Sequence, residues 1–228
     1  TRVRSSAASD VYKRQVAKAA ALGGEPKTEM WFIADAAPEA NLYVGLKKGV
    51  SRADFEDAIT TGTVEDCVHA IHPKAGESIF IPSGRLHAIG AGLLIHEIQQ
   101  NSDTTYRVYD WNRVGLDGKP RALHVEESLA SIDFDDFEPG MDVPKGDLLA
   151  ECEYFRTSRR TLDEGETLGN PLPERFSILG VVKGSLKSAD GRTFSKGAFL
   201  LLPRGAAAVT AAEASVVLQV ELPSPTHA

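Results

Sequence analysis

The residue best placed to do chemistry is His87, which ends the run Gly-Glu-Ser-Ile-Phe-Ile-Pro-Ser-Gly-Arg-Leu-His over residues 76–87. The first glycine opens a predicted strand, and Pro-Ser-Gly predicts a tight turn just before the histidine. A histidine held by a strand and a turn has the fixed position that a metal ligand requires. The simpler alternative is a histidine satisfied within the core.

Three motifs that occur in order resemble a known family. The pattern G-x5-P-x-G-x2-H is similar to the second motif of the cupin superfamily, whose small antiparallel barrels bind a metal ion at the mouth. Lys-Thr-Glu-Met-Trp over residues 27–31 and the stretch 97–111, which contains Ser-Asp-Thr-Thr-Tyr-Arg, resemble type I mannose-6-phosphate isomerases. The resemblance covers residues 16–132. It implies a zinc-dependent isomerase that interconverts mannose 6-phosphate and fructose 6-phosphate through an enediol or enediolate.

The resemblance assigns two metal ligands, Glu29 and His87, to one zinc ion per chain in the intact protein. Taken alone, Glu29 would be a solvated residue at a strand end. Carboxylate and imidazole are acceptable zinc donors, but catalytic zinc usually has three protein ligands. The family's Gln-x-His ligand pair should lie just upstream of Glu29, where this sequence has none. We therefore expect the 228-residue chain by itself to be inactive.

The family also places the arginine of the Ser-Asp-Thr-Thr-Tyr-Arg motif, Arg107, in the active site. A guanidinium suits phosphate binding or charge stabilisation but is a poor proton shuttle. We expect a strand that carries Glu97 and Arg107 on one face, which makes Glu97 the weaker catalytic candidate, for proton transfer or a hydroxyl contact. Lys119 and Arg121 follow the turn at Gly118 and are candidates for substrate phosphate binding, with solvated loop charge as the simpler alternative.

The other histidines and the cysteines have simpler structural interpretations. His69 and His72 would lie three residues apart on a helix near Cys67, but an apolar stripe and Pro73 favour a structural role over a second metal site. His96 and Glu97 are neighbours on a strand and point to opposite faces. His124 is interpreted as a first-turn residue of a helix.

Periodicity predicts the elements that must position these residues. Residues 16–22 predict a helix that stops at Gly-Gly, and residues 31–33 and 41–46 predict strands. Ser51 begins a capped helix that Gly62 ends. A second helix begins near Thr63 and carries an apolar face with Cys67 in the core, and a third covers residues 125–132. The face of the second helix consists of Val64, Cys67, Val68 and Ile71.

The second half of the chain is predicted to be a second barrel. Residues 133–146 are acidic and rich in Pro and Gly, which predicts a linker, and strands follow at residues 151–162, 176–182, 199–202 and 216–222, with a hairpin turn at Asp190-Gly191. The pattern G-x5-P-x-G recurs at residues 197–205, and Ala208 stands at the position that corresponds to His87. We expect this barrel to lack a metal site and to serve packing.

Composition limits the class of protein. The 228 residues carry a net charge of −7, and because residues 1–15 carry +3, the remainder carries −10. This acidity argues against a nucleic-acid partner, and we expect neither a membrane span nor a signal peptide. The two cysteines are far apart, which fits a reducing cytoplasm. Sequence does not determine the oligomeric state.

Residues 1–15 are basic and rich in Ser and Ala in an otherwise acidic chain. They resemble translated sequencing adapter, and the alternative is a native disordered arm. We predict a mainly β chain with a few helices: a bicupin of two small antiparallel β-barrels or jelly rolls, the first incomplete. Its domains are a catalytic metal-binding cupin with helical insertions at 16–140 and a second, metal-less cupin at 147–228.

The main alternative to an isomerase is a non-catalytic cupin module that binds sugar or assembles with partners. The incomplete ligand set favours that alternative. An iron oxygenase is disfavoured, because the sequence has no His-x-His pair for a two-histidine, one-carboxylate triad.

Overall fold

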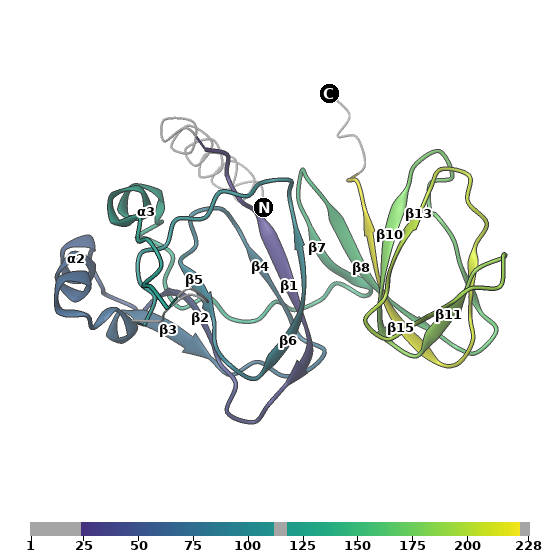
Figure 1. The fold of residues 1–228 in the computed structure, drawn as a ribbon, viewed down its shortest axis with the longest axis horizontal. Helices are drawn as coiled ribbons and strands as arrows, with labels where there is room; N and C mark the ends of the chain where they lie inside the picture. Colours follow the sequence, from purple (N-terminus) through teal and green to yellow (C-terminus); the bar gives the residue numbers. More distant parts are fainter. Residues whose placement is uncertain (1–23, 112–117, 224–228) are drawn as a thin grey trace, which may run out of the picture. The chain divides into compact units, whose positions relative to one another are not determined.

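The computed structural model describes residues 24–111 and 118–223, so the expected arm at 1–15 and helix at 16–22 lie outside the described residues. The described chain forms two compact units (Figure 1). One contains residues 24–95 and 99–141, and the other contains residues 96–98 and 142–223. None of the helices in these ranges is long and apolar enough to cross a membrane.

The first unit is built on two three-stranded sheets. One sheet has the order β4 (Ser78–Ile81), β1 (Glu29–Ala36), β6 (Leu93–Gln99), and the other has β3 (Val68–Ile71), β2 (Leu42–Leu46), β5 (His87–Ile89). One apolar cluster takes residues from both sheets: Trp31, Ile33, Ile79, Ile81, Leu42 and Val44. The sheets therefore pack against each other through a shared core, and they do not close into a barrel (Figure 1).

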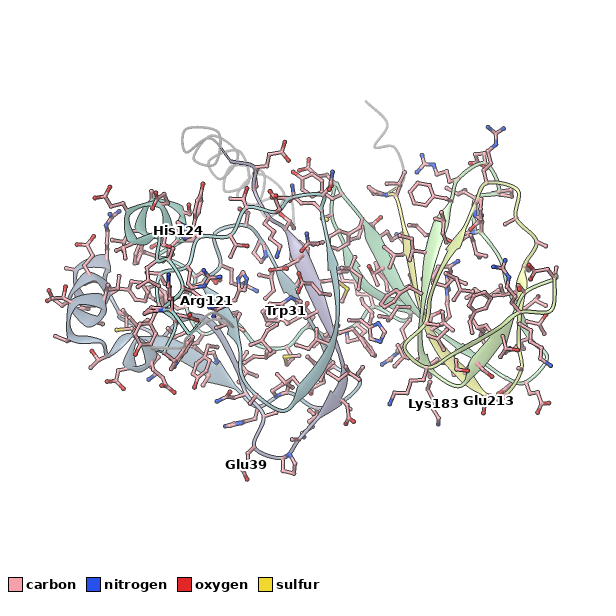
Figure 2. The ribbon with its side chains drawn as sticks, viewed as in Figure 1. Trp31, Glu39, Arg121, His124, Lys183 and Glu213 are labelled. Carbon is pink, nitrogen blue, oxygen red and sulfur yellow. The ribbon has the colours of Figure 1, made fainter. Side chains whose placement is uncertain are left out.

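Helix α2 (Arg52–Thr61) follows the expected capping chemistry. The Ser51 hydroxyl accepts the backbone N–H of Asp54, the Asp54 carboxylate accepts the backbone N–H of Ser51, and Gly62 ends the helix in the left-handed region with φ of 74°. The buried face of α2 presents Phe55 and Ala58 to a second apolar cluster of this unit. Helix α3 (Val125–Ser131) confirms the third predicted helix, with His124 at its N-cap rather than in its first turn (Figure 2).

The second predicted helix is wrong beyond its first turn. A 3-10 helix η1 (Val64–Asp66) ends at Cys67, and strand β3 begins at Val68 and pairs with β2. Val64, Cys67 and Val68 are buried together, as the helical face required, because a 3-10 turn followed by a strand also places them on one side. The core position of Cys67 is confirmed, and burial raises the pKa of its thiol.

Two further predictions along the chain need correction. The strand expected to reach Arg107 ends at Gln99, so Glu97 and Arg107 do not share a strand face. The predicted linker at residues 133–146 does contain the boundary between the two units, after Met141. Its first part is not loose, because the Asp136 carbonyl accepts the Leu46 N–H at 3.0 Å and the Asp136 side chain pairs with Arg85. The segment packs as part of the first unit.

The second unit contains two antiparallel sheets that enclose one apolar core. The five-stranded sheet has the order β13 (Phe199–Leu202), β10 (Ser177–Lys183), β15 (Ser215–Glu221), β8 (Arg156–Leu162), β7 (Leu148–Glu151). The four-stranded sheet has β12 (Thr193–Ser195), β11 (Ser185–Lys187), β14 (Val209–Ala211), β9 (Thr167–Leu168). The hairpin at Asp190-Gly191 is confirmed between β11 and β12. The single strand predicted over 151–162 is wrong, because the chain reverses at 152–155.

The repeated G-x5-P-x-G pattern has the same local structure in both units. Gly76 and Gly197 have φ of 91° and 87°, and each precedes a four-residue strand, β4 or β13. The mainly β class with few helices is confirmed for the described residues. The motif thus explains where each strand and the turn after it lie, and in the first unit that turn leads to His87.

Candidate metal centre and substrate cavity

Glu29 is the first residue of β1 and its side chain is 1% exposed. The carboxylate lies between two nitrogen atoms: Oε1 is 3.1 Å from His87 Nε2, and Oε2 is 3.3 Å from Lys27 Nζ. A buried carboxylate needs such partners, because burial without them would penalise its charged form. Glu29 is therefore buried and paired, and not a solvated residue as in the simpler interpretation.

His87 begins β5 directly after the turn, and its ring is held from two sides. Nδ1 lies 2.8 Å from the Arg85 carbonyl oxygen, and the Trp31 ring meets the imidazole at 82° with centroids 5.2 Å apart. Trp31 is fully buried on β1 and is labelled in Figure 2. The strand and turn predicted from the sequence thus bring His87 against Glu29, which lies 58 residues earlier.

This pair fits part of a zinc site. A carbonyl oxygen can only accept, so Nδ1 carries hydrogen, and Nε2 faces a carboxylate oxygen. A proton or a metal cation fits between these two atoms, and two ligand atoms of tetrahedral zinc lie roughly 3.3 Å apart. Zinc normally takes three or four protein ligands. Within residues 24–111 and 118–223, no cluster of three His, Cys, Asp or Glu side chains could hold a metal.

A cavity of about 350 Å³ opens beside His87 within the first unit. Its size is at the small end of the range for ligand pockets, which suits a monosaccharide. Cationic and aromatic side chains share the lining with His87: Lys27, Arg85, Arg107, Arg121, Tyr43, Tyr106, Tyr109 and Trp111. Glu25 and Asp110 also line the cavity, so cationic side chains outnumber acidic ones there.

Arg107 and Arg121 both line this cavity and are held differently. Arg107 lies in the loop after β6, where its Nη1 donates to the Ala122 carbonyl at 3.2 Å and its carbonyl accepts the His124 N–H at 2.8 Å. Arg121 forms a two-bond ion pair with Asp110, and this carboxylate raises the pKa of Arg121. Arg121, labelled in Figure 2, therefore brings less net charge to the cavity than Arg107 does.

Glu97 and Lys119 are not among the residues that line the cavity. Glu97 shares its strand parity with Leu93 and Ile95, but unlike them it is exposed. Buried His96 points to the opposite face, as expected. Lys119 is exposed in the segment before α3.

The candidate second metal site is not formed. Because β3 replaces the predicted helix, His69 and His72 are not on one helical face with Cys67. His72 Nδ1 lies 3.2 Å from the Ala40 carbonyl, and Cys67 is buried among apolar side chains. The structural interpretation of these residues is favoured.

Sequence reasoning missed Lys27 and the aromatic wall of the cavity, which includes Tyr43 and Trp111. Lys27 is the first residue of the Lys-Thr-Glu-Met-Trp motif at residues 27–31, so its ion pair with Glu29 could have been suspected. The wall depends on Glu65, which accepts from the Tyr43 hydroxyl at 2.5 Å and from the Trp111 indole at 3.2 Å. These contacts join residues 22 and 46 positions apart, and no local pattern indicates them.

Comparisons with known proteins support the resemblance, although no protein-family model matches the chain. Mannose-6-phosphate isomerase ManA of Bacillus subtilis is 32% identical over 189 residues, which are 78% of this chain and 59% of ManA. Mannose-6-phosphate isomerase of Streptococcus mutans is 42% identical over 103 residues, 45% of this chain and 32% of that protein. The chain thus spans about three fifths or less of these curated relatives.

Solved structures agree. The crystal structure of mannose 6-phosphate isomerase from Bacillus subtilis matches 90% of this chain and 68% of its own, with a TM-score of 0.75 and 28% identity. A putative mannosephosphate isomerase from Archaeoglobus fulgidus matches with a TM-score of 0.73 at 16% identity over 92% of this chain and 66% of its own, which supports the fold alone. The fold is therefore the cupin fold that was expected. Within that class, the chain is homologous to the mannose-6-phosphate isomerases, and the resemblance is confirmed.

Proposed function

We propose that the protein is a zinc-dependent mannose-6-phosphate isomerase that interconverts mannose 6-phosphate and fructose 6-phosphate. The observation that carries this proposal is the buried Glu29–His87 pair beside a cavity that His87, Lys27 and Arg107 line. Similarity to proteins with that name supports the reaction, and the cationic side chains of the cavity support a phosphorylated sugar.

In this proposal Glu29 and His87 hold the metal, which when bound supplies a Lewis acid for the oxygen atoms at C1 and C2 of the sugar. Lys27 and Arg107 offset negative charge on the phosphate or on the enediolate that forms as a proton moves between the two carbons. Arg121 and Lys119 are weaker phosphate candidates. Glu97 is exposed and outside the cavity lining, and it is kept as the weaker candidate for the proton transfer.

Two ligands leave a zinc site incomplete, so we propose that the remaining ligands come from outside the described residues. Residues 1–23 contain no His or Cys. Their only carboxylate or amide side chains are those of Asp10 and Gln15. The 228-residue chain by itself should then bind zinc weakly and turn over little substrate. The second unit, with Ala208 in place of a ligand, is proposed to serve packing.

The same proposal places the enzyme in the cytoplasm, which fits the two free thiols, Cys67 and Cys152. The rival is a non-catalytic cupin module that binds sugar or assembles with partners. The observation in its favour is the two-ligand set of the described residues.

The test compares zinc content and mannose 6-phosphate turnover in the 228-residue chain and in a version extended at its N-terminus to the length of the relatives. We expect about one zinc per extended chain and chelator-sensitive turnover. Sugar phosphate binding by the extended version, without zinc and without turnover, would favour the rival module.

A further inference from the structure

We propose that the junction between α2 and η1 holds three aromatic side chains as a stacking surface for the apolar face of the sugar, with Glu65 as the positioning residue. This inference rests on the proposed function only in taking a sugar phosphate as the ligand of the cavity. The aromatic wall consists of Tyr43, Tyr109 and Trp111, which all line the cavity. Glu65 is not among the described residues that line it, so Glu65 would act on the sugar only through these rings.

The three rings of the aromatic wall lie against one another. The Trp111 ring contacts both tyrosines, with its centroid 5.4 Å from that of Tyr43 and 5.2 Å from that of Tyr109. Tyr43 and Tyr109 also pack on the second apolar cluster of the first unit, yet all three residues stay partly exposed. The wall is therefore supported by the core and still offers ring surface to the cavity.

One short segment binds the polar group of every ring in the wall. Glu65 Oε1 accepts the Tyr43 hydroxyl at 2.5 Å, and Glu65 Oε2 accepts the Trp111 indole N–H at 3.2 Å. The Gly62 carbonyl accepts the Tyr109 hydroxyl at 3.0 Å. Gly62 ends α2 and Glu65 lies in η1, so the turn between them fixes all three rings. Because the carboxylate uses one oxygen for each ring, it also restricts how Tyr43 and Trp111 are oriented to each other.

The backbone of Trp111 supports a functional role for its ring. Its φ is 48°, in the left-handed region that large side chains rarely adopt. Such conformations persist only where the surrounding contacts hold them, and they are frequent where proteins bind ligands. The bond from the Trp111 indole to Glu65 is one of these contacts.

The wall begins beside the residues proposed to act on the reacting end of the sugar. Tyr43 on β2 is paired with Ala88 on β5, the residue directly after His87. A hexose presents a face of C–H groups, and aromatic side chains are a common lining for such apolar surface. Cationic side chains such as Arg107 suit the phosphate instead. The wall would thus recognise the sugar ring, and the arginine would recognise the phosphate.

The test titrates the 228-residue chain, labelled with 15N-tryptophan, with mannose 6-phosphate and separately with inorganic phosphate. The chain has two tryptophans, and the indole signal that disappears in Trp111→Phe is that of Trp111. We expect mannose 6-phosphate to shift this signal and inorganic phosphate, which has no apolar face, to leave it in place. In Glu65→Gln the amide nitrogen cannot accept, so one ring loses its partner, and mannose 6-phosphate binding should weaken by about 10-fold.

Asp66→Asn is the matched control, because it removes the same charge from the next residue of η1, which is exposed and not among the cavity-lining residues. It should leave mannose 6-phosphate binding unchanged. Unchanged binding in Glu65→Gln, or equal weakening in both variants, would overturn the proposal. If Glu65→Gln fails to fold, Trp111→Phe decides, because it keeps a ring and loses the N–H that Glu65 accepts. Binding by Trp111→Phe as tight as in the unmodified chain would then overturn the proposal.

The unmodified chain gives an independent check. The proposal is also overturned if this chain binds no mannose 6-phosphate, if it binds the sugar without a shift of the Trp111 signal, or if inorganic phosphate shifts that signal equally. Each of these results would mean that the rings do not meet the sugar.

Kinetics of the extended version separate this proposal from the proposed function. There Glu65→Gln should raise KM more than it lowers kcat, as expected for a residue that acts on substrate binding. Sugar binding with the expected Trp111 shift but without turnover would refute the isomerase and leave the role of the wall standing. Turnover with an unchanged KM in Glu65→Gln would refute the role of the wall and leave the isomerase standing.

Discussion

Among single residues, Arg107 has the charge and the position to act on a phosphorylated sugar, since it lines the cavity with His87, whereas Arg121 is paired with Asp110. Arg107→Lys keeps the charge and loses the planar fork, so we expect kcat in the extended version to fall by about 100-fold. Arg204→Lys, an exposed change in the second unit, is the control. Steady-state kinetics with both variants checks this, and unchanged kinetics for Arg107→Lys would show a merely solvated side chain.

Tyr43 and Glu65 give a second prediction at this scale. Hydrogen bonds from Tyr43 and then from Trp111 lower the pKa of Glu65, and the bond to Glu65 raises the pKa of Tyr43. A carboxyl with a lowered folded pKa contributes stability above its unfolded pKa of about 4.3, and that stability is lost as pH falls through the folded pKa. Tyr43→Phe should therefore raise the pKa of Glu65 and reduce the loss of stability in acid.

A 13C titration of the Glu65 carboxyl, with unfolding measured across the same pH range, checks this. Tyr109→Phe is the control, because the Tyr109 hydroxyl donates to the Gly62 carbonyl and not to Glu65. An equal shift of the Glu65 pKa in both variants would mean that the Tyr43 bond is not its cause.

At the scale of elements, the start of α2 depends on the reciprocal bonds of Ser51 and Asp54. Ser51→Ala removes one of these, and loss of such a cap costs about 1 kcal/mol of stability. The bonds from Ser51 lower the pKa of Asp54, so this interaction is present above the unfolded pKa and lost in acid. Denaturant unfolding at neutral and acid pH should show that the stability difference between the unmodified chain and Ser51→Ala becomes smaller as the pH falls. Thr63→Ala is the control, because Thr63 makes no side-chain cap to η1, and an equal cost there would contradict the assignment.

Local sequence signals predicted many elements and failed where distant pairing decides the backbone. The sequence correctly predicted the turns at Gly76, Gly197 and Asp190-Gly191, because glycine readily adopts the left-handed φ values seen there. The second helix was wrongly predicted from Val64, Cys67 and Val68, because a helix and a 3-10 turn that leads into a strand both bury these three side chains together. Pairing of β3 with β2 decided the outcome, and that contact is not local.

For the whole molecule, the sequence alone could not have brought Glu29 to His87. Motif spacing suggested a ligand at His87, whereas the role of Glu29 came from the resemblance, and the two meet only because β1 and β5 lie in sheets that share a core. Lys27, Arg107 and the aromatic wall gather at the same cavity from separate segments. A catalytic cupin unit followed by a metal-less one remains our prediction for the domain roles.

The measurement that tests the central claim most directly is zinc content together with mannose 6-phosphate turnover in the extended version, for the unmodified protein and for His87→Ala. His72→Ala is the matched control, because His72 also holds a backbone carbonyl in the first unit but lies outside the cavity lining. We expect His87→Ala to lose bound zinc and nearly all turnover while remaining folded, because a cavity ligand and not core volume is removed. His72→Ala should retain both. Full zinc content and full activity in His87→Ala would contradict the account.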